Sequence, residues 1–281
     1  MRFLSIQSHV AYGHVGNSAA VFPLQRLGHE VWPVLTVNFS NHTGYGAWRG
    51  PLIAPTDVAD VVAGIDERGV LGSCDAVLSG YQGSPAIADV VLDAVARVKA
   101  ANPAATYTCD PVMGNARSGC FVDPAIPPVI RERVVPAADL ITPNQFELGF
   151  LTGLEPTTLD EVLAAADAAR AMGPSTVLVT SLEAVPEGEI GMLCVTDDGA
   201  WVVTTPLLPI KANGSGDVTA ALFTAHLRTT GSPTDALSRT ASSVYAVLEA
   251  TIASGERELR LIEAQEAIAA PEERFEVRQV R

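Results

Sequence analysis

The chain has 281 residues, of which 48% are apolar and 18% charged, and its formal net charge is −14. This composition supports a large core and excludes a disordered chain. The acidic excess argues against nucleic acid as a partner, because a phosphate backbone needs a basic face. No apolar run reaches membrane-spanning length, and the N-terminus turns polar too early for a signal peptide. The four cysteines form no CxxC pair. We therefore expect a cytoplasmic protein without a membrane partner.

From the N-terminus onward, short β-like runs alternate with amphipathic helical stretches. The alternating part has expected strands at 2–7, 30–37, 76–79, 106–109, 140–142 and 176–179, and expected helices at 18–27, 57–68, 86–100, 127–134, 145–152 and 159–172. Next come strands at 190–195 and 201–205, which Asp197-Asp198-Gly199 joins in a predicted hairpin. Helices at 217–229 and 233–254 complete the core, and a charged tail follows from Glu256.

This alternation predicts an α/β fold with a mostly parallel sheet covered by helices on both faces. No repeat or linker interrupts the pattern, so we expect a single domain over residues 1–281. Ligands of such folds bind at the carboxyl ends of the strands. Polar or glycine-rich clusters follow five of the expected strands, at 8–9, 41–44, 80–83, 110–111 and 142–144.

The sharpest local feature is Asn213-Gly214-Ser215-Gly216-Asp217, which leads directly into a helical run. A glycine turn and the free N–H groups of a new helix form a site suited to phosphate. Asp217 has two interpretations: a base at the mouth of that site, or a residue that simply caps the helix. The chain has no GxxxxGK[ST] loop, and the glycines near residue 13 lack dinucleotide spacing.

A second feature is Thr142-Pro143-Asn144-Gln145-Phe146-Glu147. Glu147 stands where a capping box would place it, three residues after Asn144. Alternatively, Glu147 and Asp110 lie near a cation that bridges phosphates, since hard cations prefer carboxylate and water oxygens.

These motifs together resemble the ribokinase-like kinases, and among them the pyridoxal kinases. Gly214-Ser215-Gly216-Asp217 looks like the GxGD signature of the superfamily. The pyridoxal kinase branch is indicated by residues 110–114, 142–147, 6–17 and 38–46, and the similarity covers essentially the whole chain. The resemblance implies a ribokinase-like three-layer sandwich, phosphorylation of the 5′-hydroxyl of pyridoxal by ATP, a requirement for Mg²⁺, a monovalent cation such as K⁺, and a homodimer.

The resemblance also implies roles for individual residues. Asp217 would be the catalytic base, in the turn formed with Gly214, Ser215 and Gly216. The pyridoxal side would comprise Ser8, Thr43, Gly44 and Tyr81, and the ATP and metal side Asp110, Thr142, Glu147, Thr180, Ser181, Lys211, Asn213, Gly214 and Gly216, with Asp110 and Glu147 nearest the metal. Gly44 replaces a glutamine common in bacterial members, and Phe121 stands where some members have a tyrosine.

Residues 115–123 form a polar, glycine-containing loop that we expect to cover ATP as a lid. Two other functions are kept as alternatives: a hydroxymethylpyrimidine kinase of the same superfamily, and a non-catalytic pyridoxal-binding protein. The intact GxGD turn favours a kinase over a carrier, because a carrier has no use for a base beside an anion site.

Overall fold

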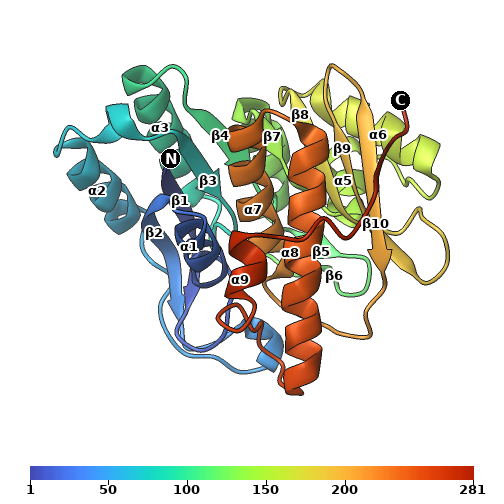
Figure 1. The fold of residues 1–281 in the computed structure, drawn as a ribbon. Helices are drawn as coiled ribbons and strands as arrows, with labels where there is room; N and C mark the ends of the chain where they lie inside the picture. The colour runs from blue at the N-terminus through green and yellow to red at the C-terminus, as the bar shows by residue number, and fades with distance from the viewer.

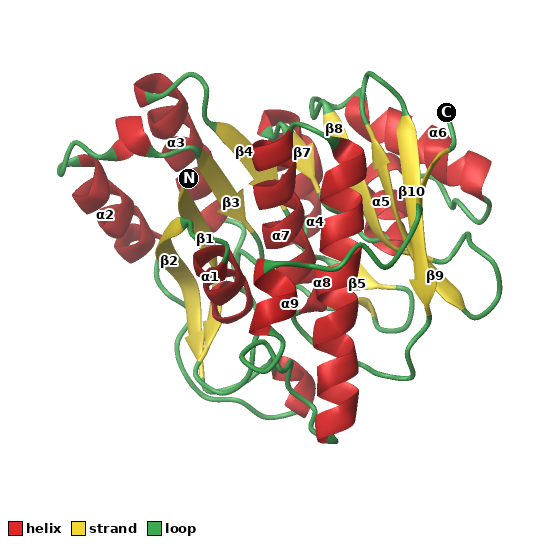
Figure 2. Cartoon of the chain, viewed as in Figure 1, coloured by secondary structure: helices red, strands yellow, loops and turns green.

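A computed structural model describes residues 1–281 and shows strands alternating with helices along the chain (Figures 1 and 2). The strands are β1 (Arg2–Val10), β2 (Glu30–Phe39), β3 (Ala76–Ser79), β4 (Thr106–Cys109), β5 (Gly114–Asn115), β6 (Gly119–Cys120), β7 (Leu140–Ile141), β8 (Thr176–Leu182), β9 (Glu189–Val195), β10 (Ala200–Pro206) and β11 (Val277–Gln279). The α-helices are α1 (Asn17–Arg26), α2 (Pro55–Asp66), α3 (Ile87–Ala101), α4 (Ile126–Val129), α5 (Gln145–Thr152), α6 (Leu159–Arg170), α7 (Ser215–Thr230), α8 (Pro233–Ser254) and α9 (Gln265–Ala269). Short helical turns occupy η1 (Thr43–Tyr45), η2 (Leu71–Ser73), η3 (Ile130–Val134) and η4 (Val135–Ala137).

Nine strands form one sheet in the order β11-β10-β9-β8-β7-β4-β3-β1-β2. The strands from β2 to β8 pair in parallel, whereas β9 and β11 run antiparallel to their neighbours. The mostly parallel sheet and the β9–β10 hairpin are therefore confirmed. The parallel strands run toward the lower edge of the molecule in Figure 1, so their carboxyl ends meet there.

Helices cover both faces of this sheet, which makes three layers. Helices α1, α7, α8 and α9 pack on one face, where Phe3 and Leu78 of the sheet meet Ala221 of α7. The larger core lies on the other face, under α2, α3, α5 and α6. The parallel strands are buried on both sides because helices cover both faces, and β1 therefore also buries the polar Ser5, Gln7 and Ser8.

Several element boundaries differ from those expected. Strand β1 continues to Val10 and β8 to Leu182, so Ser8 and Thr180 lie inside strands rather than after them. The helix expected at 127–134 is a four-residue α-helix followed by a π-turn. The charged tail contains α9 and an edge strand, β11, and the expected loop 115–123 carries the small β5–β6 hairpin. The pairing of β11 with β10 is long-range, so local periodicity does not reveal it.

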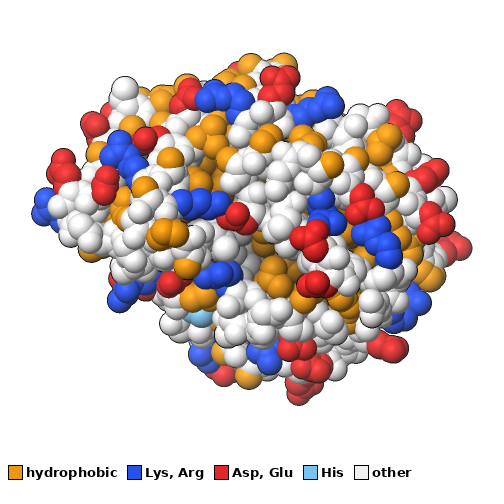
Figure 3. Space-filling model, turned by 90° about the horizontal axis from the view of Figure 1, so that it is seen from above, with side chains coloured by type: hydrophobic (Ala, Val, Ile, Leu, Met, Phe, Trp, Pro, Cys, Tyr) orange, Lys and Arg blue, Asp and Glu red, His pale blue; other side chains and the backbone are white.

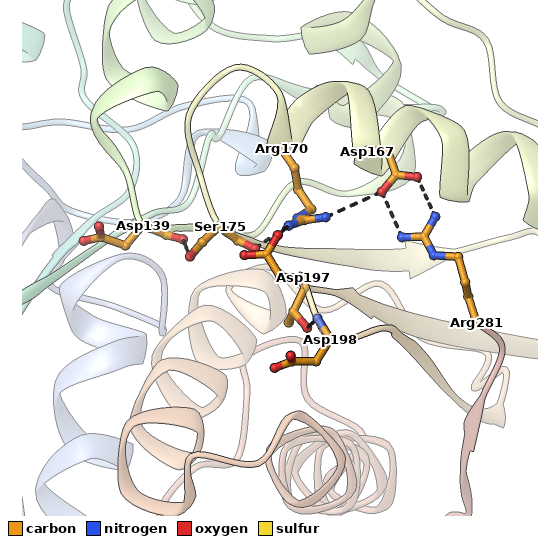
Figure 4. Close-up of polar contacts among 8 residues, drawn as sticks. Asp139, Asp167, Arg170, Ser175, Asp197, Asp198 and Arg281 are labelled. Carbon is orange, nitrogen blue, oxygen red and sulfur yellow. Dashed lines mark hydrogen bonds and ion pairs between the residues drawn. The ribbon is translucent and has the colours of Figure 1, made fainter.

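Ion pairs attach the edge of the sheet to helix α6 (Figure 4). Arg281 makes two hydrogen bonds to Asp167, at 2.5 and 2.9 Å, while Arg170 contacts Asp197 and the carbonyl of Ser175. These groups are mostly solvent-exposed, so each pair adds little stability. Their effect is to align β11 and the β9–β10 turn beside α6.

The surface carries mixed charges. On the face seen in Figure 3, acidic and basic side chains are interspersed with apolar ones, and the basic side chains form no continuous area. No helix of the chain combines the length and apolarity that crossing a bilayer requires.

Candidate active site

Helix α7 begins with an open anion-binding turn at the carboxyl edge of the sheet. Its N-cap is Gly214, with φ of +86°, and no side chain caps the helix. The amides of the first turn are consequently free to bind an anion. A Cβ on Gly214 would lie 1.8 Å from the carbonyl oxygen of His14, whereas one on Gly216 would meet nothing within 4 Å. The turn is therefore closed on the His14 side and open on the Gly216 side.

Asp217 is the third residue of α7, not its cap, because Gly214 occupies the N-cap position. The alternative role as a helix cap is thus wrong. Burial raises the pKa of the Asp217 carboxyl to about 6, although a hydrogen bond from the backbone of Gly16 acts in the opposite direction. Gly16 has φ of +55°, and a Cβ there would lie 2.3 Å from both the carbonyl and hydroxyl oxygens of Ser8. Glycine at position 16 therefore lets one loop contact both Ser8 and the candidate base.

Two further acids lie behind Asp217. Asp110 follows β4 and is buried, with its Oδ1 accepting a hydrogen bond of 3.0 Å from the hydroxyl of Thr142. Burial, together with the nearby charges of Glu147 and Asp217, raises the pKa of Asp110 well above its usual value. Burial likewise raises the pKa of Glu147 to about 7. Asp110 and Glu147 are buried carboxyl groups whose negative charges are poorly compensated in the free protein, and a bound cation would neutralise them.

Glu147 forms the capping box expected from the sequence, and it also binds backbone amides of a distant loop that neither sequence interpretation predicted. The capping box with Asn144 is present. In addition, its Oε1 accepts hydrogen bonds from the amides of Met113 and Gly114, at 2.8 and 3.2 Å, and its Oε2 accepts one of 3.0 Å from Asn144. Glu147 therefore connects α5 to the start of the β5–β6 hairpin. No group of three or more His, Cys, Asp or Glu side chains is arranged to hold a metal by itself.

Replacing Glu147 with alanine is expected to destabilise the fold by about 3 kcal/mol, because three backbone N–H groups, two of them buried, lose their acceptor. Glu161 is a matched control, since it makes the same capping box at the start of α6 but is exposed. Urea unfolding of both variants checks the difference, and tryptic cleavage at Arg117 should accelerate in Glu147→Ala alone. Equal losses of stability in the two variants would contradict the bracing role.

The predicted nucleotide side lies around the end of β8. A register shift between Val179 and Leu182 interrupts the ladder there, and Ser181 adopts a left-handed φ of +47°. The amide of Thr180 donates to the carbonyl of Pro143 at 2.9 Å, which places β8 directly beside the 142–147 motif. Lys211 and Asn213 lie in the loop that leads from β10 into the anion turn, with Lys211 exposed.

The predicted pyridoxal side lies across from it. Ser8 is buried in β1, and Tyr81 packs against a small cluster that includes Val37 and Phe39. Thr43 and Gly44 form the exposed turn η1, which His42 caps by accepting a 3.0 Å hydrogen bond from the amide of Gly44. The fold thus gathers the residues predicted from the sequence at one edge of the sheet. Sequence reasoning missed Gly16, the His14 carbonyl and the Met113 and Gly114 amides that bind Glu147. The Gly13-x-x-Gly16 spacing was the only signal for the first two, and no local pattern indicated the two amides.

Comparison with known proteins decides the family. A phosphomethylpyrimidine kinase family model matches residues 68–261. Pyridoxal kinases PdxY of Leifsonia xyli and Corynebacterium diphtheriae are 71% and 60% identical, each over the full length of both chains. The chain belongs to the pyridoxal kinase family.

Solved structures agree with this assignment. The pyridoxal kinase of Leishmania donovani, determined in complex with ADP and pyridoxamine, superimposes with a TM-score of 0.94 at 29% identity and covers 100% of this chain and 99% of its own. The ribokinase-like sandwich predicted from the sequence is confirmed. A putative phosphomethylpyrimidine kinase of Bacteroides thetaiotaomicron has a TM-score of 0.91 at 23% identity, which shows a common fold.

Proposed function

We propose that this member of the pyridoxal kinase family transfers the γ-phosphoryl group of ATP to the 5′-hydroxyl of pyridoxal. The observation that carries the proposal is Asp217, a carboxylate with a pKa of about 6 in the first turn of α7, beside an open set of backbone amides. Full-length identity of 71% to a pyridoxal kinase supports the same substrate. The Leishmania protein holds ADP with pyridoxamine or pyridoxine, which supports a ternary site in this fold.

In the proposed reaction, the 5′-hydroxyl attacks the γ-phosphorus in line and Asp217 accepts its proton. A pKa near 6 leaves this carboxylate mostly ionised at neutral pH, and makes it a better acceptor than an ordinary aspartate. The amides of Gly214, Ser215 and Gly216 stabilise the negative charge of the transferring group. Such positioning and charge neutralisation are the main requirements of phosphoryl transfer, whose transition state is loose.

The remaining residues divide between the two substrates. Thr142, Thr180, Ser181, Lys211 and Asn213 line the ATP side. Ser8, Thr43, Gly44 and Tyr81 line the pyridoxal side. Residues 115–123 close over ATP as a lid, and Glu147 supports that lid through the Met113 and Gly114 amides.

Asp110 and Glu147 would hold Mg²⁺, which would neutralise phosphate charge when bound. Asp110 is the better direct ligand because Glu147 already accepts three backbone hydrogen bonds. Glu147 would act through water. A monovalent cation such as K⁺ and a homodimeric state are proposed on the family resemblance. A cytoplasmic location is proposed on the cysteine pattern and the polar N-terminus of the sequence.

The deciding assay measures ATP- and Mg²⁺-dependent formation of pyridoxal 5′-phosphate, with hydroxymethylpyrimidine assayed in parallel. Phosphorylation of pyridoxal supports the proposal. Turnover of the pyrimidine alone would leave the kinase class intact and assign the alternative substrate, whose only support is the description of the matching family model. Binding of pyridoxal without turnover would favour the non-catalytic protein.

The pH dependence of rate and stability should run in opposite directions. Turnover is expected to fall as pH drops through about 6, because protonated Asp217 cannot accept a proton. Burial raises the pKa values of Asp110, Glu147 and Asp217 above those of the unfolded chain. The folded state therefore binds these protons more tightly than the unfolded chain does, and protonation increases the free energy of unfolding. That stabilisation is present at low pH and is lost as pH rises through about 6 to 7. Rate profiles and thermal melts of the free enzyme between pH 5 and 8 check both trends; a rate independent of pH over this range would exclude Asp217 as the base.

A further inference from the structure

A buried glutamate outside the predicted catalytic set joins two parts of the pyridoxal side. Glu258 follows α8 and is only 8% exposed. Its Oε1 accepts a hydrogen bond of 2.6 Å from the hydroxyl of Tyr45, and its Oε2 accepts one of 3.2 Å from the amide of His14. The two donors come from segments more than 200 residues away in the chain. A single carboxylate therefore connects the turn η1 to the loop between β1 and α1.

The neighbouring chain is shaped to admit this carboxylate. Gly13 has φ of +92°, and a Cβ there would lie 2.0 Å from Oε2 of Glu258. A residue with a side chain at position 13 would therefore be strained and would displace the glutamate. The hydrogen bond to Glu258 is also the largest cause that raises the pKa of Tyr45 to about 12. Gly13 leaves space for the Glu258 carboxylate on one side, and Tyr45 donates a hydrogen bond to it on the other.

Arg257 holds the same turn by different atoms. Its guanidinium lies 3.9 Å from the centre of the Tyr45 ring and donates a hydrogen bond of 2.9 Å to the carbonyl of Gly44. The turn η1 has no buried residue, and its other hydrogen bonds are local. Two hydrogen bonds connect the turn to the rest of the molecule: Arg257 donates to the Gly44 carbonyl, and Tyr45 donates to Glu258.

The loop on the other side of Glu258 leads to the candidate base. The carbonyl of His14 packs against Gly214, and the backbone of Gly16 lies close enough to the Asp217 carboxyl to lower its pKa. Leu259 packs in the same cluster as Val218 of α7. Displacing Glu258 would therefore loosen the turn at 43–45 and, through the β1–α1 loop, the surroundings of Asp217.

We propose that Glu258 is a positioning residue for the pyridoxal side: it latches the Thr43–Tyr45 turn to the 13–16 loop and so holds the substrate subsite in shape. The inference rests on the proposed function, in which Thr43 and Gly44 contact the pyridine ring. Glu258 touches neither substrate. Its effect passes through Tyr45 and His14, and the part of the ATP side formed by Thr142, Thr180 and Ser181 is not connected to the latch by these contacts.

The test compares Glu258→Gln and Tyr45→Phe with Glu256→Gln, a neighbouring exposed glutamate that pairs with Arg260 on the surface. A glutamine keeps one acceptor but turns an N–H toward one of the two donors, and phenylalanine removes the other end of the contact. Loss of a hydrogen bond to a charged group predicts about a tenfold rise in KM for pyridoxal in both variants, with KM for ATP within about twofold of the wild type. The double variant should be little worse than either single one, because both remove the same contact.

Hydrogen exchange provides a second readout that does not depend on turnover. The amides of Gly44 and Gly46, which donate within the turn, should exchange about tenfold faster in both variants and remain unchanged in Glu256→Gln. If Glu258→Gln does not fold, Tyr45→Phe decides by itself. Unchanged KM for pyridoxal together with unchanged exchange would overturn the latch. If the wild type does not phosphorylate pyridoxal, the proposed function fails, and the exchange rates alone then decide whether the latch exists.

Discussion

Asp217→Asn is expected to lower kcat about a thousandfold, because general-base contributions are commonly in the range of about 10² to 10⁴. The substitution keeps the size of the side chain and removes its ability to accept a proton. ATP binding should be retained, since the amides of the anion turn are unaffected. Steady-state kinetics and nucleotide titration measure the two effects separately.

The control for this variant is Asp235→Asn. Asp235 occupies the same third position in the first turn of α8, where it is exposed and remote from the anion turn. It should leave kcat unchanged. Because burial raises the pKa of Asp217, the neutral asparagine should also unfold at a temperature at least as high as the wild type above pH 6. A rate near that of the wild type in Asp217→Asn would remove this residue from the mechanism.

Gly214→Ala is expected to lower kcat by about a hundredfold, since a Cβ in this position would lie 1.8 Å from the carbonyl oxygen of His14. Either the anion turn or the β1–α1 loop must move to relieve the clash. In the proposed reaction, both carry groups that contact Asp217 or the transferring phosphoryl group. Small displacements of such groups are sufficient to cause large losses of rate.

Gly231→Ala provides the matched control for backbone strain. Gly231 ends the same helix with φ of +67°, and a Cβ there would meet nothing within 4 Å. It should cost only the strain of a left-handed alanine, about 1 to 2 kcal/mol, without loss of kcat. Denaturant unfolding and kinetics of the two variants separate strain from the clash. Equal kcat in both would show that the close approach of His14 does not shape the site.

Most of the fold could be predicted from the sequence: the alternation of elements, the hairpin at Asp197–Gly199 and the three-layer sandwich. These features arise from local periodicity, turn chemistry and motif similarity. The candidate acids were found because each follows a strand or opens a helix, and parallel strands bring their carboxyl ends to one edge.

By itself, the sequence determined which residue types stand at the ends of which elements, and it identified the family through their order. Only the tertiary structure decided what those residues approach: the Gly16 backbone beside Asp217, Glu147 accepting the amides at the start of the β5–β6 hairpin, and Glu258 joining Tyr45 to His14. It also decided the strand order and added β11. The physical reason is that local patterns report on neighbours along the chain. The burial of a side chain is decided by segments that meet only after folding. The pKa values and hydrogen bonds that depend on burial are therefore decided there too.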